Sequence, residues 1–309
     1  IGGIMIPYMV REGYSKEFAT GLSAVSGSLG IIIPPSIPFV IYGIATNSNI
    51  GTLFIAGFGP GIMIGIALIV VSRFICKKRG YLGTERKSTG KEKLQAINEA
   101  KWALIMPLII LGGIYGGIFT RTEAAAVAIF YSLFVGFFVY KELKWKDVFS
   151  ILDTTASFVG AVMLAFAPAA ALGAVLSMLG VPGMVSDLLL SISSNIYVIM
   201  FIVMLVLIVA GMILDTISAI VLLAPILSGA LIPMGIDPIH LGTVMIVALA
   251  IGFVTPPVAQ NLFVASGMTG LPMHKIVKEA FPFIVTMLVC LVLITFFPEI
   301  SLALPTLLS

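Results

Sequence analysis

The composition of the chain already restricts its class. Its 309 residues are 60% hydrophobic and only 10% charged, with a net charge of +3, whereas soluble domains carry about 25% charged residues. This composition excludes a soluble enzyme, a nucleic-acid-binding protein and a disordered chain, and it predicts an all-α polytopic membrane protein. Cys76 and Cys290 lie far apart in the sequence, so neither a disulfide framework nor a cysteine metal site is supported.

Apolar segments long enough to cross a bilayer recur along the whole chain. The predicted segments are 18–46, 53–75, 103–119, 123–140, 155–178, 196–213, 217–233, 239–267 and 281–297. Because only three residues separate 196–213 from 217–233, this pair predicts a re-entrant hairpin over 196–233 with its tip at membrane depth. Residues 91–101 and 141–149 are predicted as interfacial helices.

The cations predict the sidedness of these segments. If 18–46 runs outward and the later segments follow in order, every Lys and Arg except Arg121 faces the cytoplasm, as the positive-inside rule requires. The charges do not distinguish the hairpin from two full spans, because both leave the later segments on the same sides.

Two of the long segments share an interrupted pattern. Gly30–Pro35 ends in two prolines and is followed 25 residues later by Pro60, and Gly252–Pro257 is followed 25 residues later by Pro282. Proline lacks an N–H and clashes with the preceding turn, so neither stretch can remain helical. The pattern therefore predicts two discontinuous helices, each made of two half-helices joined near the bilayer centre.

Such breaks offer two kinds of binding group. Carbonyl oxygens at the end of the first half-helix suit a cation such as Na⁺, and the N-terminus of the second half-helix suits an anion. Paired interrupted segments are typical of the binding site of a secondary transporter. The polar side chains near the breaks are Ser26, Ser28, Ser36, Thr255, Gln260 and Asn261. Their alternative role is to bond the backbone groups that a kinked helix frees.

Asp215 is the one carboxylate predicted to lie at membrane depth, at the hairpin tip beside Thr216. An intramembrane acid is costly and indicates a functional site. It is a candidate for neutralising a bound Na⁺ or for carrying a proton. Its alternative role is to cap the helix that follows it, and the two roles are compatible.

Several motifs together resemble a known family. They are Ile6-Pro7, Gly13-Tyr14, Gly30–Gly43, Phe119–Val127, Leu214-Asp215-Thr216 and Gly252–Asn261. With these motifs in order over essentially its whole length, the chain resembles the large membrane subunit (DctM-like, SiaM-like) of tripartite ATP-independent periplasmic (TRAP) transporters.

The resemblance implies an inverted-repeat elevator transporter. Such a protein performs sodium-coupled import of an organic acid anion, for example a C4-dicarboxylate or sialic acid, across the bacterial cytoplasmic (inner) membrane. It implies Na⁺ as coupling ion without an organic cofactor, and as partners a periplasmic substrate-binding protein, a small four-span membrane subunit and the lipid bilayer, but no nucleic acid. The implied sodium-binding residues are Ser26, Ser28, Gly30, Pro34, Asp215, Thr216, Gly252, Thr255 and Pro256. The implied substrate-binding residues are Pro35, Ser36, Pro257, Gln260 and Asn261.

The resemblance also implies a division of the chain. Residues 1–76 form a first-repeat transport region with the end of a first hairpin, the broken helix 18–46 and the following span. Residues 77–101 form a cytoplasmic loop, and residues 102–194 form scaffold spans with interfacial helices. Residues 195–309 form a second-repeat transport region with the hairpin 196–233, the broken helix 239–267 and the last span.

Two departures and three alternatives accompany this interpretation. The family's first hairpin tip is expected just before Ile1, so we expect the chain to be the later part of a longer membrane protein, and Arg121 stands where the family usually has Pro. An elevator carrier without a binding protein is the main alternative. An intramembrane enzyme is disfavoured because no HExxH motif is present and because His240 and His274 are predicted on opposite sides of the membrane. A channel is disfavoured because the polar lining is not continuous.

Overall fold

The computed structural model describes residues 2–81 and 89–308, and every regular element in these ranges is a helix. Within these ranges, seven helices are long and apolar enough to cross a membrane. The chain divides into two compact units, one made of residues 1–84 and 166–309 and the other of residues 85–165. Residues 82–88 of the predicted cytoplasmic loop lie outside the described residues. The predicted loop covered residues 77–101. In the structure one helix continues to Arg79 and the next begins at Gly90, so the non-helical connection is shorter than predicted.

The larger unit begins with the first interrupted segment. Ser15 caps the second helix, since its side chain accepts a hydrogen bond from the Phe18 N–H at 3.3 Å. Asn49 caps the long fifth helix in the same way. The elements are α1 (Gly2–Arg11), α2 (Lys16–Gly27), α3 (Leu29–Ile32), α4 (Ile37–Thr46) and α5 (Ile50–Arg79).

The rest of the larger unit holds the predicted hairpin and the second interrupted segment. Its elements are the end of α8 (Trp145–Met178), α9 (Val181–Ile192), α10 (Ile196–Ile213), α11 (Thr216–Leu231), α12 (Pro238–Gly252), α13 (Gln260–Thr269), α14 (Met273–Phe296) and α15 (Glu299–Leu308). Helices α9 and α15 were not predicted from the sequence, because both are too short for a span. It also began the last span too late, since α14 starts at Met273.

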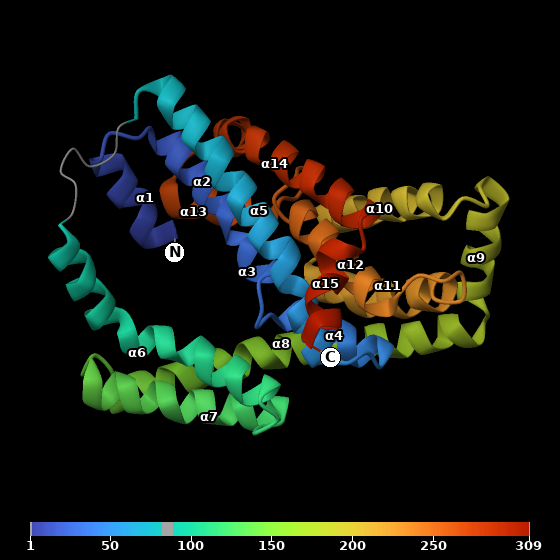
Figure 1. The fold of residues 1–309 in the computed structure, drawn as a ribbon, viewed down its shortest axis with the longest axis horizontal. Helices are drawn as coiled ribbons and strands as arrows, with labels where there is room; N and C mark the ends of the chain where they lie inside the picture. The colour runs from blue at the N-terminus through green and yellow to red at the C-terminus, as the bar shows by residue number, and fades with distance from the viewer. Residues whose placement is uncertain (1, 82–88, 309) are drawn as a thin grey trace. The chain divides into compact units, whose positions relative to one another are not determined.

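Helix α12 is the centre of the larger unit (Figure 1). All its residues from His240 to Gly252 are buried, and it packs against α4, α5, α10, α11 and α14. A helix that is apolar all round lies either in a protein core or in a membrane, and the burial of α12 places it in the core of this unit. The Tyr42 hydroxyl of α4 donates to the Pro238 carbonyl oxygen at 2.8 Å, and its ring lies against Gly242, where a Cβ would clash. The two interrupted segments are therefore packed together around α12.

Helix α15 covers one side of this core. It packs on α5 at Gly59, where a Cβ would collide with the Ile300 carbonyl. The buried His240 ring bonds on one side to the Ser301 hydroxyl at 2.8 Å and on the other to the Thr295 carbonyl at 3.3 Å. Both ring nitrogens are thus engaged in joining α12, α14 and α15.

The smaller unit consists of α6 (Gly90–Tyr115), α7 (Arg121–Phe134), the π-helix η1 (Val135–Val139) and the start of α8. The predicted interfacial helix 91–101 is not separate, because α6 is continuous from Gly90. The second predicted interfacial helix, 141–149, is wrong over residues 141–144, and from Trp145 onward it belongs to α8. Thr120 and Glu123 form a capping box at the start of α7. The side chain of Arg121 is not among those that the structure describes.

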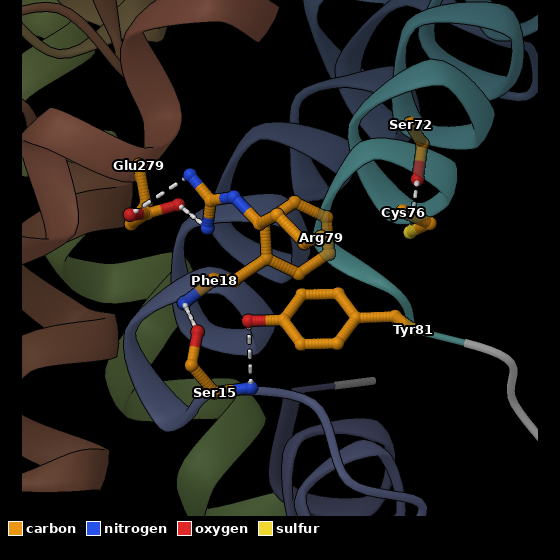
Figure 2. A network of polar contacts seen from close by, with 7 residues as sticks. All are labelled: Ser15, Phe18, Ser72, Cys76, Arg79, Tyr81 and Glu279. Carbon is orange, nitrogen blue, oxygen red and sulfur yellow. Dashed lines mark hydrogen bonds and ion pairs between the residues drawn. The ribbon is translucent and has the colours of Figure 1, made fainter.

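A polar cluster joins α2, α5 and α14 beside one end of the larger unit (Figure 2). We call it the Arg79 cluster: Ser15, Phe18, Arg79, Tyr81 and Glu279. Arg79 donates to Glu279 through both Nη atoms, at 2.6 and 3.2 Å, and its guanidinium lies 5.4 Å from the centre of the Phe18 ring. The Tyr81 oxygen accepts the Ser15 N–H at 3.3 Å. The Ser15 hydrogen bond and the nearby Arg79 charge lower the pKa of the Tyr81 hydroxyl.

Candidate ion and substrate site

The predicted break in the first segment is present. Helix α3 ends at Ile32, residues Ile33 and Ser36 are extended, and α4 begins at Ile37. The Ser36 hydroxyl donates to the Ile31 carbonyl oxygen at 2.5 Å, so it satisfies a backbone group that the break frees. This is the alternative role that the sequence left open for Ser36.

The predicted break in the second segment is also present. Helix α12 ends at Gly252 and α13 begins at Gln260, after Ala259 in a left-handed conformation. The Thr255 hydroxyl donates to the Ile251 carbonyl at 2.7 Å, and the Asn261 N–H donates to the Phe253 carbonyl at 3.2 Å. The Leu262 and Phe263 N–H groups donate to the Ala259 carbonyl at 2.8 and 3.0 Å, so α13 begins beside the end of α12 with most of its first N–H groups bonded to backbone carbonyls. The Pro34–Pro35 and Pro256–Pro257 peptide bonds are both cis.

The predicted hairpin tip lies against the second break. Helices α10 and α12 cross where Gly211 meets Gly252, and a Cβ on Gly252 would lie 2.6 Å from the Gly211 Cα and 2.8 Å from the Ile208 carbonyl oxygen. Next to this crossing, the Val258 N–H in the break donates to the Met212 carbonyl at 3.3 Å. The end of α10 is thereby fixed to the broken backbone of the second segment.

Asp215 begins α11 as its cap. Its Oδ2 accepts the Ser218 N–H at 3.0 Å, and the side chain is only partly buried. The capping role is therefore present, and one carboxylate oxygen is occupied by it. The other oxygen accepts no hydrogen bond from the residues that the structure describes, which leaves room for the second predicted role.

Thr216 has an unusual hydroxyl. The residue is 6% exposed, and its Oγ1 is the one buried side-chain polar atom without a hydrogen-bond partner among the residues that the structure describes. An unsatisfied buried polar group costs about 1–3 kcal/mol. Such an atom at a helix tip, next to an acid and to a broken helix, is suited to contact a bound ion.

The two interrupted segments meet through Asn261. Its Nδ2 donates to the Ala24 carbonyl oxygen at 3.3 Å and lies 3.4 Å from the Ser28 hydroxyl. Ser28 is fully buried. A cavity of about 230 Å³ between α1, α2 and α13 is lined by Ser23, Gly27 and Asn261 together with apolar side chains. The structure thus brings together a predicted sodium ligand and a predicted substrate ligand.

The remaining predicted residues are placed as follows. Ser26 points away from Asn261 and lines a different cavity against α5, so its grouping with Ser28 in one site is not supported. Gly30, Pro35 and Pro257 are exposed, Pro34 is buried, and Pro256 and Gln260 are partly buried. In the described ranges no group of three or more His, Cys, Asp or Glu side chains lies close enough to hold a metal ion. The available donors at the breaks are carbonyls, hydroxyls and one carboxylate, which suit hard cations.

Sequence reasoning missed Gly211 and the Met212 carbonyl. The signal for Gly211 was a single glycine in an otherwise unbroken apolar helix, which often marks close helix packing in membranes. Its partner Gly252 was already recognised as part of a break, but nothing in the sequence paired the two positions.

Interrupted helices that meet a hairpin tip among long apolar helices define a polytopic membrane protein with the site architecture of a secondary transporter. The sequence model of the family "Tripartite ATP-independent periplasmic transporter, DctM component" matches residues 1–300, and the chain belongs to this family of transporter permeases, which are not enzymes. The resemblance seen in the sequence is confirmed.

Three relatives illustrate the similarity. The C4-dicarboxylate TRAP transporter large permease protein DctM of Vibrio cholerae is 41% identical over 328 residues, covering all of this chain and 72% of that relative. The sialic acid TRAP transporter large permease protein SiaM of the same organism is 38% identical, covering 99% and 72%. The isethionate TRAP transporter permease protein DctMQ of Oleidesulfovibrio alaskensis is 40% identical, covering 98% of this chain. The chain spans only 48% of that third relative.

Proposed function

We propose that the chain carries out sodium-coupled import of an organic acid anion by an elevator mechanism, as part of the large membrane subunit of a TRAP transporter in the bacterial cytoplasmic membrane. A periplasmic binding protein would deliver the anion, and a small four-span subunit would complete the membrane part. One observation carries the proposal. The unpartnered Thr216 hydroxyl lies at the hairpin tip, where α10 is bonded to the broken backbone between α12 and α13.

The ion site is inferred from the donors at this junction. The C-terminal end of α12 directs backbone carbonyls toward the break, and such half-helix ends coordinate Na⁺ in secondary transporters. Asp215 supplies a negative charge and Thr216 an unused oxygen. Helix α11 has 16 residues, fewer than the roughly 20 of a full span, which supports a hairpin that ends at membrane depth.

The anion site is inferred from two helix N-termini. Helices α4 and α13 each begin directly after a break, and neither has a side-chain cap. The positive end of the helix dipole at each N-terminus favours a negatively charged ligand. The substrates in the names of the three relatives are C4-dicarboxylate, sialic acid and isethionate, all of which are anions at neutral pH.

Uptake into proteoliposomes tests the proposal. The complete transporter would be reconstituted, and a panel of labelled organic acids would be offered with an imposed inward Na⁺ gradient, with K⁺ replacing Na⁺ as control. We expect uptake of at least one acid only with Na⁺ and only with binding protein. Uptake that is equal with Na⁺ and K⁺ would contradict sodium coupling. Uptake that does not need the binding protein would support the carrier alternative.

Thr216→Val separates an ion ligand from a structural hydroxyl. Valine has the same shape and removes an oxygen that no protein group bonds, so we expect unchanged or higher melting temperature. If Thr216 contacts Na⁺, the Na⁺ concentration for half-maximal uptake should rise about tenfold, which corresponds to the loss of about 1.4 kcal/mol. A Thr216→Val transporter with unaltered Na⁺ dependence would exclude this residue from the ion site.

Asp215→Asn tests the negative charge at the same hairpin tip. Asparagine is also a good helix cap, so the bond to the Ser218 N–H is retained and abundance should change little. The lost charge should weaken the Na⁺ dependence of uptake more than it lowers protein abundance. The comparison is Asp237→Asn, which changes an equivalent cap at the start of α12. If the two variants behave alike, Asp215 acts only as a cap.

A further inference from the structure

A groove runs between α2–α3 and α5, from the helix turn before the first break toward the end of α5. Its volume is about 440 Å³. Its α5 wall is a single stripe of residues three and four positions apart: Gly65, Leu68, Ile69, Ser72, Arg73 and Cys76. This spacing places them on one face of the helix. At 1.5 Å per residue, the groove extends about 12 Å along the helix axis from Gly65 to Arg73.

One end of the groove is apolar and open. Leu22 and Leu29, with Ser26 between them, form its wall on α2 and α3, and Leu68 and Ile69 line its α5 side. A Cβ added to Gly65 would meet nothing within 4 Å, so the floor of the groove is empty there. On the same stretch of α5, Ile66 and Ile69 are 57% and 68% exposed. This part of the helix presents an apolar surface of the kind that faces hydrocarbon.

The other end of the groove is polar and positively charged. It is bordered by Tyr14, Ser72, Arg73 and Cys76, and no Asp or Glu is among the described residues that line the groove. The Ser72 hydroxyl and the Cys76 sulfur are 4.0 Å apart (Figure 2). Lys77 and Lys78 follow on the same helix. An apolar channel that ends in an arginine at a cationic membrane boundary is complementary to a lipid with an anionic headgroup.

Arg73 differs from Arg79 in its partners. The Arg79 guanidinium is occupied by Glu279 and covered by Phe18. Within the part of the chain that the structure describes, the Arg79–Glu279 pair is the one ion pair found, so no described acid pairs with Arg73. Its side chain is exposed beside the groove and is available to an anion.

We propose that this groove binds an anionic phospholipid. One acyl chain lies against Leu22, Leu29 and Gly65, and the phosphate is held by Arg73 with the Ser72 hydroxyl as a further donor. Tyr14 lies at the boundary, as amphipathic aromatic rings do at membrane interfaces. The apolar length below Arg73 assigns the ligand to a lipid and not to a free phosphate. The proposal does not depend on the transported substrate or on sodium coupling.

Cys76 provides a probe inside the groove. It is partly exposed, whereas Cys290 is buried. The full transporter, with every other cysteine replaced by Ala, would be placed in nanodiscs of phosphatidylcholine alone or with added phosphatidylglycerol. Labelling of Cys76 by an uncharged maleimide would then be timed. In parallel, native mass spectrometry would count the phosphatidylglycerol molecules that the complex retains.

Phosphatidylglycerol should slow the labelling of Cys76, and Arg73→Gln should weaken that protection about fivefold, as expected for one cation at a membrane surface. Lys78→Gln removes the same charge from a residue that does not line the groove and should keep the protection. Gly65→Leu fills the floor and should lower lipid retention, while its open surroundings let the protein fold. Retained lipid should fall in Arg73→Gln and Gly65→Leu but not in Lys78→Gln.

Four results would overturn the proposal. They are equal labelling in both lipids, equal effects of Arg73→Gln and Lys78→Gln, protection by soluble glycerol phosphate in the absence of lipid, and a Cys76 that never reacts even in delipidated protein. The third would assign Arg73 to a free anion, and the fourth would show that polypeptide covers the groove.

Discussion

Replacing Gly252 with Ala is expected to abolish uptake and to lower the melting temperature of the protein. The added methyl group would lie 2.6 Å from the Gly211 Cα and 2.8 Å from the Ile208 carbonyl oxygen. Both neighbours are backbone atoms, which cannot change rotamer to make room. Overpacking of a core costs about 1–3 kcal/mol even when side chains adjust. Here the substitution must separate α10 from α12 and so displace the hairpin tip from the second break.

The matched control is Gly267→Ala in α13, where an added Cβ meets nothing within 4 Å. Because alanine is the better helix former, this variant should be as stable as the parent or more so, by about 0.5–1 kcal/mol. Uptake and melting by intrinsic fluorescence would be measured for both variants. Normal transport by the Gly252→Ala protein would show that the close approach of α10 and α12 is not needed for function.

The second large effect is expected from replacing Pro256 and Pro257 together with Ala. Without prolines the chain from α12 to α13 regains every N–H that a continuous helix needs. A continuous helix would remove the carbonyl end of α12 and the N-terminus of α13, and with them both proposed binding groups. We expect uptake to fall at least about tenfold while protein abundance is retained, because the healed helix forms more backbone hydrogen bonds.

Pro282→Ala is the comparison for this double variant. Pro282 lies inside α14, which remains helical from Met273 to Phe296, so its removal should leave uptake nearly unchanged. Equal activity of the parent and the Pro256→Ala, Pro257→Ala protein would show that the discontinuous helix is not part of the transport mechanism.

These prolines show which features of the structure a local sequence pattern predicts. Pro60 and Pro282 lie at equal distances after the two Pro-Pro pairs, and this equal spacing is a repeat in the sequence. The structure shows that the four paired prolines end helices, whereas Pro60 and Pro282 do not. A pair of prolines removes two successive N–H groups, while a single proline in a long membrane helix loses one bond that neighbours can replace.

The polar residues near the breaks separate in the same way. The sequence placed Ser26 and Ser28 before the first break, as implied sodium ligands, and Ser36 after it, as an implied substrate ligand. In the structure the Ser28 hydroxyl lies 3.4 Å from the Asn261 amide nitrogen, and the Ser36 hydroxyl donates to the Ile31 carbonyl. Ser26 lines a groove against α5. Residues one and two positions apart on a helix point in different directions, so a hydroxyl can be assigned to a site only when its neighbouring helices are known.

The shortage of charge and the Pro-Pro pairs determined, from sequence alone, that this protein is a helical membrane protein with two interrupted segments. These are local properties: hydrocarbon excludes charge, and proline breaks the backbone hydrogen bonds next to it. The tertiary structure decided what lies beside each break. The contact of Gly211 with Gly252, the bond from Asn261 toward Ser28 and the unpartnered Thr216 hydroxyl each join or isolate groups far apart in the sequence. Long-range contacts of this kind depend on how whole helices pack, and no local pattern records them.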